Sequence, residues 1–595
     1  MNTIDPKEGL NIKSAKVSIH KINMSNGILH LDFSVRSINK DQDFTFLSLK
    51  LIKRDNKETM ITLPVTVKSS GQQKCRLSSH ILLSELPLDS FYWDFYVSIQ
   101  TSSINVEDIR VICDHYLILK KLRHLMTTFT AITDQNYMIY PYVTVNGGLS
   151  ITYRKKGEYE EPKHKIMEYT AYFYYHIIYK FIPKPSVWLI HEKFSETAQD
   201  NSFYFFKYCY DKHPEKKVYY VIKEGTKDEK QLTPYKDKVI YFMSFKHLLL
   251  LISSKLIISS EAKGHGYAWR VSRGVFKKVI TAKKFVFLQH GVLGLKKVDS
   301  TFNYNTQNSA ELFVASSDYE KEIIKSNFGY KTNQIMVTGL ARWDVLVDKS
   351  QLKGENEQKE ILLMPTWRNW LEEVEEEQFI RSDYYQEYNQ LLQSPILLDY
   401  LKKENLLLNF YVHPKFMPYV SAFVQSNGHI RVMEFGDESV NELIMRASLL
   451  ITDYSSVAWE MYYQSKPVIF YHFDLEKYNQ YQGSYMDFNK ELFGDVAYTN
   501  MELIDKLKHS SKLGFKEKES DLKMKKNYFK FIDHQNSQRI YNEIISLEKR
   551  LSKRKLNVSG LILNSDILRI SWRRYKHNTC VKWLIHKLRR VRARG

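Results

Sequence analysis

The clearest sign of fold class in this sequence is LLITDYSSVAWEMYYQSKPVIFY, residues 449–471. An apolar run leads into Asp453, Ser455 and Ser456, a segment of helical character follows, and a second apolar run begins after Pro467. Short runs of β-branched or aromatic residues that alternate with helix-length segments are typical of parallel α/β sheets. This segment therefore predicts a strand, a loop, a helix and a second strand of one such sheet.

The same alternation extends outward from this segment, from residue 187 to about residue 548. Its other apolar runs are VWLI, VYYVI, KLIISS, FVFLQ, LFVASS and IMVTG, and then ILLMPTW and LLLNFYVHP. The charged stretch KSQLKGENEQKE, residues 349–360, divides the series. We therefore predict two Rossmann-like domains, at 187–348 and 349–548, that face a cleft.

The two ends of the chain have a different character. Over residues 1–115, the alternating runs LHLDFSVRS, FLSLKLIKR, MITLPVTVKS and FYWDFYVSIQ predict an antiparallel, β-rich accessory domain. We expect a linking region at 116–186, with a hairpin at Asn146-Gly147 and an aromatic helix that either contacts a membrane or packs in a core. Residues 549–595 are predicted to form a basic amphipathic tail, since 571–595 contain nine basic residues and no acidic one.

Composition restricts the function. With 87 Lys and Arg against 67 Asp and Glu, the chain carries a net charge of +20, which calls for an anionic partner such as a polyphosphate substrate, a membrane or nucleic acid. Its four cysteines lie far apart, which argues against a disulfide scaffold or a zinc ribbon. Because no carboxylate cluster suggests Mg²⁺ held by the protein alone, we expect no protein-bound metal. We also expect no secretory signal and no transmembrane helix.

Chemistry-bearing side chains follow several predicted strands, where ligands bind in open α/β sheets. His290 and His413 each end such a strand, and a histidine there can act as a general base, although a hydrogen-bonded structural histidine is the plainer alternative. Arg368 follows another strand and suits phosphate through its planar fork. Ser455 and Ser456 stand at a helix start, where hydroxyls cap the helix or hold a phosphate.

In their order along the chain, these motifs resemble the CDP-glycerol glycerophosphotransferase family. That family includes the poly(glycerol phosphate) and poly(ribitol phosphate) polymerases of teichoic acid synthesis and related capsule polymerases. The resemblance includes WLIHEKFSETAQDNSFYFFKY at 188–208, then QHG, TGLARWD, PTWR, HP, the segment 441–456 and FYHFDLEKYNQYQGSYMDF at 470–488. It implies a two-domain GT-B fold in which the second domain holds most of the nucleotide.

The resemblance also implies a reaction. A polyol phosphate would move from CDP-glycerol or CDP-ribitol to the hydroxyl end of a lipid-linked polymer, with release of CMP and with no cofactor. The residues that the family ties to activity map to His290 and His413, and we expect His290 to be the base, with His413 as the alternative. The expected donor or phosphate ligands are Thr366, Arg368, Thr452, Asp453, Ser455, Ser456, Arg342 and Gly291. The further expected substrate contacts are His265, Glu442 and Asp487.

A lipid-linked acceptor implies a peripheral protein at the cytoplasmic face of the cell membrane, where the basic tail would contact anionic lipid. Two other functions stay open: a GT-B glycosyltransferase that uses a nucleotide-sugar donor in cell-surface polysaccharide synthesis, and a non-catalytic protein that binds anionic polymer. No RNA- or DNA-binding motif is evident, so we expect no nucleic-acid partner. The choice of polyol, the distinction between primase and polymerase, and a homo-oligomeric state also stay open.

Overall fold

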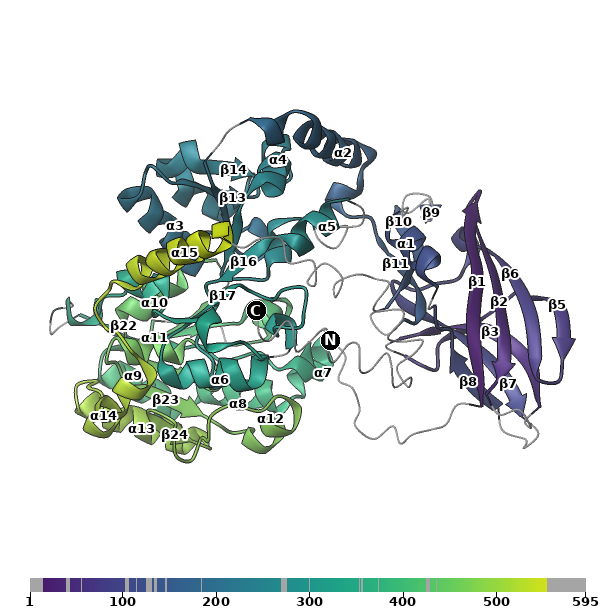
Figure 1. Cartoon of the computed structure of the whole chain (residues 1–595). Helices are drawn as coiled ribbons and strands as arrows, with labels where there is room; N and C mark the ends of the chain where they lie inside the picture. Colours follow the sequence, from purple (N-terminus) through teal and green to yellow (C-terminus); the bar gives the residue numbers. More distant parts are fainter. Residues whose placement is uncertain are drawn as a thin grey trace. The chain divides into compact units, whose positions relative to one another are not determined.

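The computed structural model describes residues 14–38, 43–54, 56–101, 106–113, 115–124, 131–132, 136–144, 147–182, 185–268, 275–298, 300–352, 354, 357–372, 374–423, 428–434 and 436–553. The chain forms two compact units, one built mainly from the residues up to Tyr169 and the other mainly from Thr170 onward (Figure 1). Within these ranges, no helix combines the length and the apolar character needed to cross a bilayer. The predicted basic tail lies outside the described residues from 554 onward.

The first unit consists of two antiparallel sheets that enclose one core (Figure 1). One sheet has the order β1 (Ala15–Ser25), β2 (Ile28–Ser37), β6 (Lys74–Leu82) and β5 (Thr66–Gly71). The other has the order β4 (Met60–Leu63), β3 (Phe44–Lys53), β7 (Phe91–Thr101), β11 (Leu149–Lys155), β10 (Tyr137–Val143) and β9 (Ala131–Ile132), with β8 (Val106–Arg110) also paired to β7. Every second residue of β7 from Trp93 to Ile99 is fully buried, as the alternation in its sequence requires.

Two details of this unit differ from the sequence-based expectation. The run MITLPVTVKS does not form one strand: it breaks at Pro64, which cannot donate a ladder hydrogen bond, and β4 and β5 join different sheets. The hairpin of β10 and β11 was assigned to a linking region, but β11 pairs with β7 and completes the larger sheet. The β-rich unit therefore extends past residue 115, and it also carries the helix α1 (Tyr116–His124).

The second unit contains two parallel sheets covered by helices (Figure 1). The first sheet has the order β14 (Val239–Tyr241), β13 (Lys217–Ile222), β12 (Val187–His191), β15 (Leu256–Ser259), β16 (Lys284–Phe287), β17 (Leu312–Ala315) and β18 (Ile335–Val337). The second has the order β21 (Ile430–Met433), β20 (Leu406–Tyr411), β19 (Lys359–Leu363), β22 (Ala447–Thr452), β23 (Val468–Tyr471) and β24 (Asp495–Ala497). The predicted mixed α/β fold with parallel sheets is confirmed.

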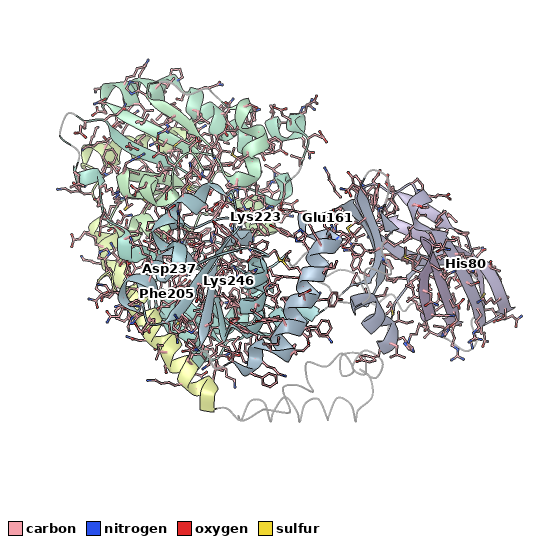
Figure 2. All side chains as sticks on the ribbon, turned by 90° about the horizontal axis from the view of Figure 1, so that it is seen from above. His80, Glu161, Phe205, Lys223, Asp237 and Lys246 are labelled. Carbon is pink, nitrogen blue, oxygen red and sulfur yellow. The ribbon has the colours of Figure 1, made fainter. Side chains whose placement is uncertain are left out.

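Helices precede, separate and follow the strands of the second unit. They are α2 (Pro162–Ile177), α3 (Asn201–Lys212), α4 (Phe245–Ser253), α5 (Val275–Ala282), α6 (Asp318–Phe328), α7 (Glu376–Ile380), α8 (Asp383–Gln393), α9 (Pro395–Lys403), α10 (Val440–Arg446), α11 (Ala458–Tyr463), α12 (Leu475–Tyr481), α13 (Asn500–Lys512), α14 (Glu519–Tyr528) and α15 (Asn536–Lys553). Phe205 of α3 is fully buried in the core that both sheets share (Figure 2). In this unit the sequence analysis did not predict β14, β21 and β24, and each is a short edge strand. In the first unit it did not single out β1, β6, β8 and β9.

The last helix returns to the first α/β domain. In Figure 1, α15 lies along α3. The Glu548 carboxylate accepts hydrogen bonds from the indole Nε1 of Trp188 at 2.8 Å and from Ser186, and it forms an ion pair with Lys216. The predicted second domain over 349–548 therefore ends in a helix that packs on the first domain, and this helix fastens the two domains together.

Replacing Glu548 with alanine should destabilise the protein, because the buried indole N–H of Trp188 would lose its acceptor. An unsatisfied buried donor costs about 1–3 kcal/mol, so we expect differential scanning calorimetry to show a Tm about 2–8 °C lower. Glu543→Ala, at an exposed position on the same helix, is the matched control and should change stability by less than about 0.5 kcal/mol. Equal Tm values for the two variants would contradict the view that Glu548 anchors α15 to the first α/β domain.

Candidate active site

The strand order of each parallel sheet defines where a ligand can bind. In the first sheet the order in which successive strands are added reverses between β12 and β15, and in the second between β19 and β22. A crevice opens outside the carboxyl ends of the strands at such a switch point. Glu192 and Glu261 follow β12 and β15, while Thr366 and Asp453 follow β19 and β22. The topology thus selects these two loop pairs as the candidate site.

A strained backbone delivers His290 into this region. Gln289, immediately before it, has φ +65°, which is rare for a residue with a side chain. Buried hydrogen bonds hold that conformation: the Gln289 amide donates to the Val314 carbonyl at 2.7 Å and to Glu320 at 2.8 Å. The next side chain, His290, is consequently 70% exposed at the end of a buried strand.

Gly291 allows the two α/β domains to approach closely beside His290. A Cβ atom at Gly291 would lie 2.5 Å from the Ser456 hydroxyl of the second domain, a distance that real Cβ contacts do not show. A larger residue would require the Ser456 hydroxyl to rotate away and the Ser456 Cβ, 3.0 Å distant, to shift slightly, so glycine suits this close approach. The HG motif and the TDYSS loop, both predicted to carry chemistry, are therefore neighbours, and Gly291 has a steric role.

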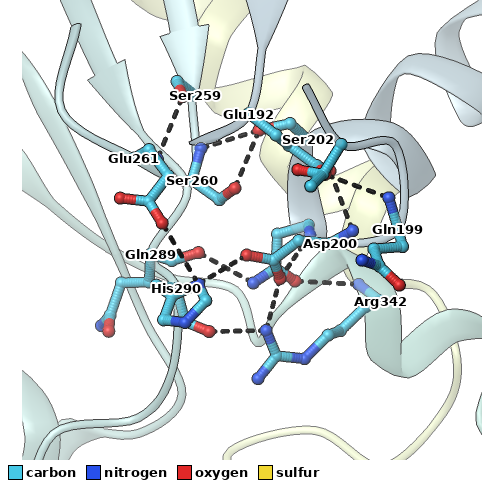
Figure 3. Close-up of polar contacts among 12 residues, drawn as sticks. Glu192, Gln199, Asp200, Ser202, Ser259, Ser260, Glu261, Gln289, His290 and Arg342 are labelled. Atoms are coloured by element: carbon cyan, nitrogen blue, oxygen red, sulfur yellow. Dashed lines mark hydrogen bonds and ion pairs between the residues drawn. The ribbon is translucent and has the colours of Figure 1, made fainter. Parts of the chain in front are cut away.

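His290 lies between two acidic side chains (Figure 3). Its Nδ1 is 2.8 Å from the Asp200 carboxylate and 3.7 Å from that of Glu261. Desolvation acts to lower the pKa of His290, but the charge and hydrogen bond of Asp200, together with the charge of Glu261, outweigh it and raise the pKa to about 9. A neutral ring would keep its proton on Nδ1, facing Asp200, and would present an unprotonated Nε2.

Arg342 binds carboxylates, and Figure 3 shows it beside Asp200 and His290. Its guanidinium forms ion pairs with Asp200 of the first domain and Glu460 of the second, and it donates to the carbonyl oxygen of His290. The indole of Trp343 donates to the same Glu460 oxygen at 3.0 Å. The hydrogen bonds of the Arg342 side chain hold two loops of its own domain, at Asp200 and His290, and Glu460 on α11 of the other domain. We therefore interpret this predicted phosphate ligand as a positioning residue.

In the second domain, Arg368 is likewise bound by carboxylates. Its side chain is fully buried, 2.8 Å from Asp453 and 2.7 Å from Asp474. Asp453 also accepts from the backbone N–H of Thr366 at 2.8 Å, and it is fully buried. The hydroxyl of Thr452 is turned to the Met364 carbonyl at 2.6 Å. The geometry therefore assigns Arg368, Asp453 and Thr452 to the support of the loop, not to direct phosphate contact.

Three of the predicted donor ligands, Ser455, Ser456 and Thr366, have hydroxyl groups at the site that are not bound to carboxylates. Ser455 and Ser456 are half-buried, and they precede the six-residue helix α11 without capping it, because its N-cap is Val457. Thr366 is buried, and its hydroxyl has no hydrogen-bond partner among the residues that the structure describes. Hydroxyl groups, rather than a helix dipole or a buried arginine, are what this loop offers to a ligand.

His413 differs from His290 in protonation. Its Nδ1 accepts a hydrogen bond from the backbone N–H of Lys415 at 3.1 Å. Burial, followed by the charges of Lys193 and Lys296, lowers the pKa of His413 to about 3. The ring is therefore neutral at physiological pH with its proton on Nε2, which makes it a hydrogen-bond donor.

The three further predicted substrate contacts lie in different parts of the structure. His265 lies 3.8 Å from Glu261 and stacks on Phe194 with ring centroids 4.4 Å apart, so it adjoins the His290 group. Glu442 forms an ion pair with Lys349 near the start of α10. Asp487 accepts from the backbone of Asn489 at 3.0 Å and caps its own turn. Only His265 joins the cluster around His290.

The sequence analysis assigned no role to the acidic residues that organise the site. Asp200 caps α3, and Glu192, fully buried, accepts backbone N–H bonds from the same loop at 2.8–3.0 Å. Both stand in the segment 188–208 that carried the family resemblance, which was the available signal. Glu460 and Glu261 had no such signal, since a carboxylate in a helix or loop is usually solvent-facing.

The chain is similar to one sequence family and to several known proteins. A sequence family described as CDP-Glycerol:Poly(glycerophosphate) glycerophosphotransferase matches residues 173–546. The minor teichoic acid biosynthesis protein GgaB of Bacillus subtilis is 31% identical over 390 residues, which are 63% of this chain and 41% of that protein. The teichoic acid glycerol-phosphate transferase of Staphylococcus aureus is 24% identical over 413 residues, 64% of this chain and 98% of that protein. A solved structure of the wall teichoic acid polymerase TagF aligns with a TM-score of 0.47 and 16% identity, over 66% of this chain and 95% of that chain.

The protonation of His290 can be measured directly. In protein labelled with ¹³C-histidine, we expect one ring resonance with a pKa near 9 that disappears in His290→Ala. Asp200→Asn removes the charge that favours the protonated ring, so the pKa should fall toward the ordinary value of about 6.5. Asp487→Asn, a carboxylate outside the cluster, should leave it unchanged. A His290 pKa near 6.5 in the unmodified protein would contradict this electrostatic assignment.

Proposed function

The chain belongs to the CDP-glycerol:poly(glycerophosphate) glycerophosphotransferase family, and from this membership we propose that it transfers a polyol phosphate from a CDP-activated donor to the hydroxyl end of a teichoic-acid-type polymer. The observation that carries the proposal is the Asp200–His290 pair beside the Ser456 loop of the second domain. This pair places an oriented base where the loops of both domains meet, in the arrangement that acyl- and phosphoryl-transfer sites need.

The proposed reaction is a displacement at phosphorus. The acceptor hydroxyl oxygen forms a new bond to the phosphorus that carries the polyol, the bond from that phosphorus to the CMP oxygen breaks, and CMP leaves. His290 Nε2 takes the hydroxyl proton, while Asp200 holds the ring orientation through Nδ1 and stabilises the imidazolium that forms. Negative charge grows on the leaving phosphate, and the Nε2–H of His413 and the hydroxyls of Ser455 and Ser456 are the donors that the second domain supplies.

The tautomers separate the two candidate bases. The Nδ1 of His413 is occupied by the Lys415 N–H, so its outward nitrogen carries a proton and cannot accept another. His290 presents the opposite arrangement, with a carboxylate at Nδ1 and an accepting Nε2 in the neutral ring. We therefore assign His290 as the base and His413 as a donor to phosphate oxygens.

We further propose that the protein works at a membrane surface, where a lipid-linked acceptor would lie. Helix α2 and the turn after it expose a row of large apolar side chains: Ile166 (66%), Phe173 (57%), Ile177 (67%) and Phe181 (70%). Three of these are spaced as one helix face, and Lys180 follows them. An apolar face with a flanking cation is suited to the interface of an anionic bilayer.

The transfer is tested by CMP release from purified full-length protein supplied with CDP-glycerol or CDP-ribitol and a short phosphopolyol acceptor. Release with one donor would support the reaction and name the polyol, and His290→Ala should reduce it at least 10³-fold. Because a base must be deprotonated, the rate should rise with pH up to about 9. If the protein releases a nucleotide from a sugar nucleotide but no CMP from either CDP-polyol, the proposal is wrong and the protein is a glycosyltransferase.

The membrane contact is tested by co-sedimentation with phosphatidylglycerol vesicles. Phe173→Asp combined with Ile177→Asp removes two apolar side chains worth about 1.5–3 kcal/mol each, so partitioning should fall at least tenfold. Leu522→Asp, an exposed leucine on α14, introduces the same kind of charge elsewhere and should bind as the unmodified protein does. Unchanged binding of the double variant would contradict a role for α2.

A further inference from the structure

The smaller sheet of the first unit, with the strand order β1, β2, β6 and β5, has one side in the core and one side outward (Figure 1). Every second residue of β2 from Leu29 to Val35 is buried, and so is every second residue of β6 from Cys75 to Ile81. Because successive side chains of a strand point to opposite sides, the residues between them face outward. We call this outward side of the four strands the basic face.

The basic face carries far more positive than negative charge. Its four strands, all of whose residues the structure describes, contain one acidic residue, Asp32, and six exposed basic ones: Lys16, Lys21, Arg36, Lys68, Lys74 and Arg76. The single carboxylate is already engaged, because Lys68 donates to Asp32 at 2.7 Å. None of Lys21, Arg36, Lys74 and Arg76 forms an ion pair with another residue that the structure describes.

The strand register places some of these cations directly opposite one another. Arg36 of β2 is paired with Lys74 of β6, and on its other side with Lys16 of β1. Arg76 follows on the same side of β6, opposite Ser34. Like charges at directly opposite positions of an antiparallel pair destabilise the sheet, and an anion that binds between them removes this repulsion.

The larger sheet of the same unit balances its charges. Arg54 and Arg110 each lie 2.7 Å from the Asp94 carboxylate, and Lys50 is 3.5 Å from that of Asp108. One sheet of this unit therefore pairs its cations with carboxylates, and the other leaves a row of cations on its surface. Stability of the fold does not account for that difference.

A histidine on the basic face responds to the unbalanced charge. The Nε2 atom of His20 lies 2.8 Å from the hydroxyl of Ser34. Burial, followed by the charges of Arg76 and Lys74, lowers the pKa of His20, while the charge of Asp32 opposes them. The positive potential of the face thus extends across neighbouring strands.

The side chains around the cations favour one kind of anion. The outward positions of the four strands hold no Phe, Tyr or Trp on which a nucleic-acid base could stack. The outward neighbours of Arg36, Lys74 and Arg76 include the hydroxyls of Ser18 and Ser69 and no large apolar side chain that could enter a bilayer. Cations interspersed with hydroxyl groups suit a hydrated polymer whose units carry both phosphate and hydroxyl groups.

We propose that the basic face binds the phosphodiester chain of the acceptor polymer, at a site separate from the site of transfer. This inference rests on the proposed function for the identity of the polymer, and it gives the β-rich unit a role in holding that chain. Outward side chains repeat at about 5 Å across the strands and about 7 Å along them, so one chain can contact several cations with successive phosphates. Many weak contacts along one chain act together, which gives a long polymer an advantage over a single phosphate.

Isothermal titration of the full chain with a long glycerol phosphate oligomer tests this site without turnover. Arg36→Gln combined with Lys74→Gln should raise the Kd about fivefold or more and make it less sensitive to salt, because two exposed cations that attract phosphate are lost. Lys57→Gln combined with Lys155→Gln removes two exposed lysines of the same unit that lie outside the basic face, and it should leave the Kd unchanged. Equal Kd values for the two double variants would overturn the proposal.

Two further measurements separate polymer binding from other roles of the same cations. The Tm of the Arg36→Gln, Lys74→Gln variant should be no lower than that of the unmodified protein, because the substitutions remove a repulsion; a lower Tm with unchanged oligomer binding would assign the cations to folding and overturn the proposal. Phosphatidylglycerol vesicles and single-stranded DNA serve as alternative anions. If this variant loses binding of either by as large a factor as it loses the oligomer, the assignment to the polymer is wrong.

Failure of this inference can be distinguished from failure of the proposed function. If no CDP-polyol is turned over but the Arg36→Gln, Lys74→Gln variant loses oligomer binding, the polymer site stands and the proposed reaction fails. If turnover occurs and oligomer binding does not respond to the variant, the reaction stands and the polymer site fails.

Discussion

The buried guanidinium of Arg342 is the contact on which the site depends. A buried charge is tolerated only when opposite charges and hydrogen bonds surround it, and Arg342 finds one carboxylate in each α/β domain, Asp200 and Glu460. The same side chain holds the carbonyl of His290. The need to neutralise this one guanidinium therefore holds the two α/β domains together and fixes the position of His290, the candidate base.

The second domain also contains a buried arginine that is neutralised by two carboxylates. Arg368 is enclosed by Asp453 and Asp474, and aromatic rings lie over its guanidinium, including that of Tyr454. A planar fork with five donors can satisfy several loops at once, which a lysine ammonium cannot do. The arginines therefore build the scaffold of both switch points.

The two histidines show how environment divides chemical roles. His290 and His413 have the same side chain, yet one faces carboxylates and the other faces lysines and a backbone donor. Their pKa values are consequently separated, near 9 and near 3. Opposite shifts within one site are the expected sign of a proton acceptor and a hydrogen-bond donor that work together.

The sequence alone predicted the fold class, most strands of the parallel sheets and the strand-end positions of the two histidines, because buried runs are visible in the local hydrophobic pattern. It did not single out β1 and β6, although both are long strands. It did not reveal the edge strands β14, β21 and β24, which are too short to show a pattern, nor that α15 packs on the first domain. Only the tertiary structure decided the roles of Arg342 and Arg368, since their partners stand up to 142 residues away in the chain. Charge pairing over such separations depends on which strand ends the topology brings together, and no local spacing records it.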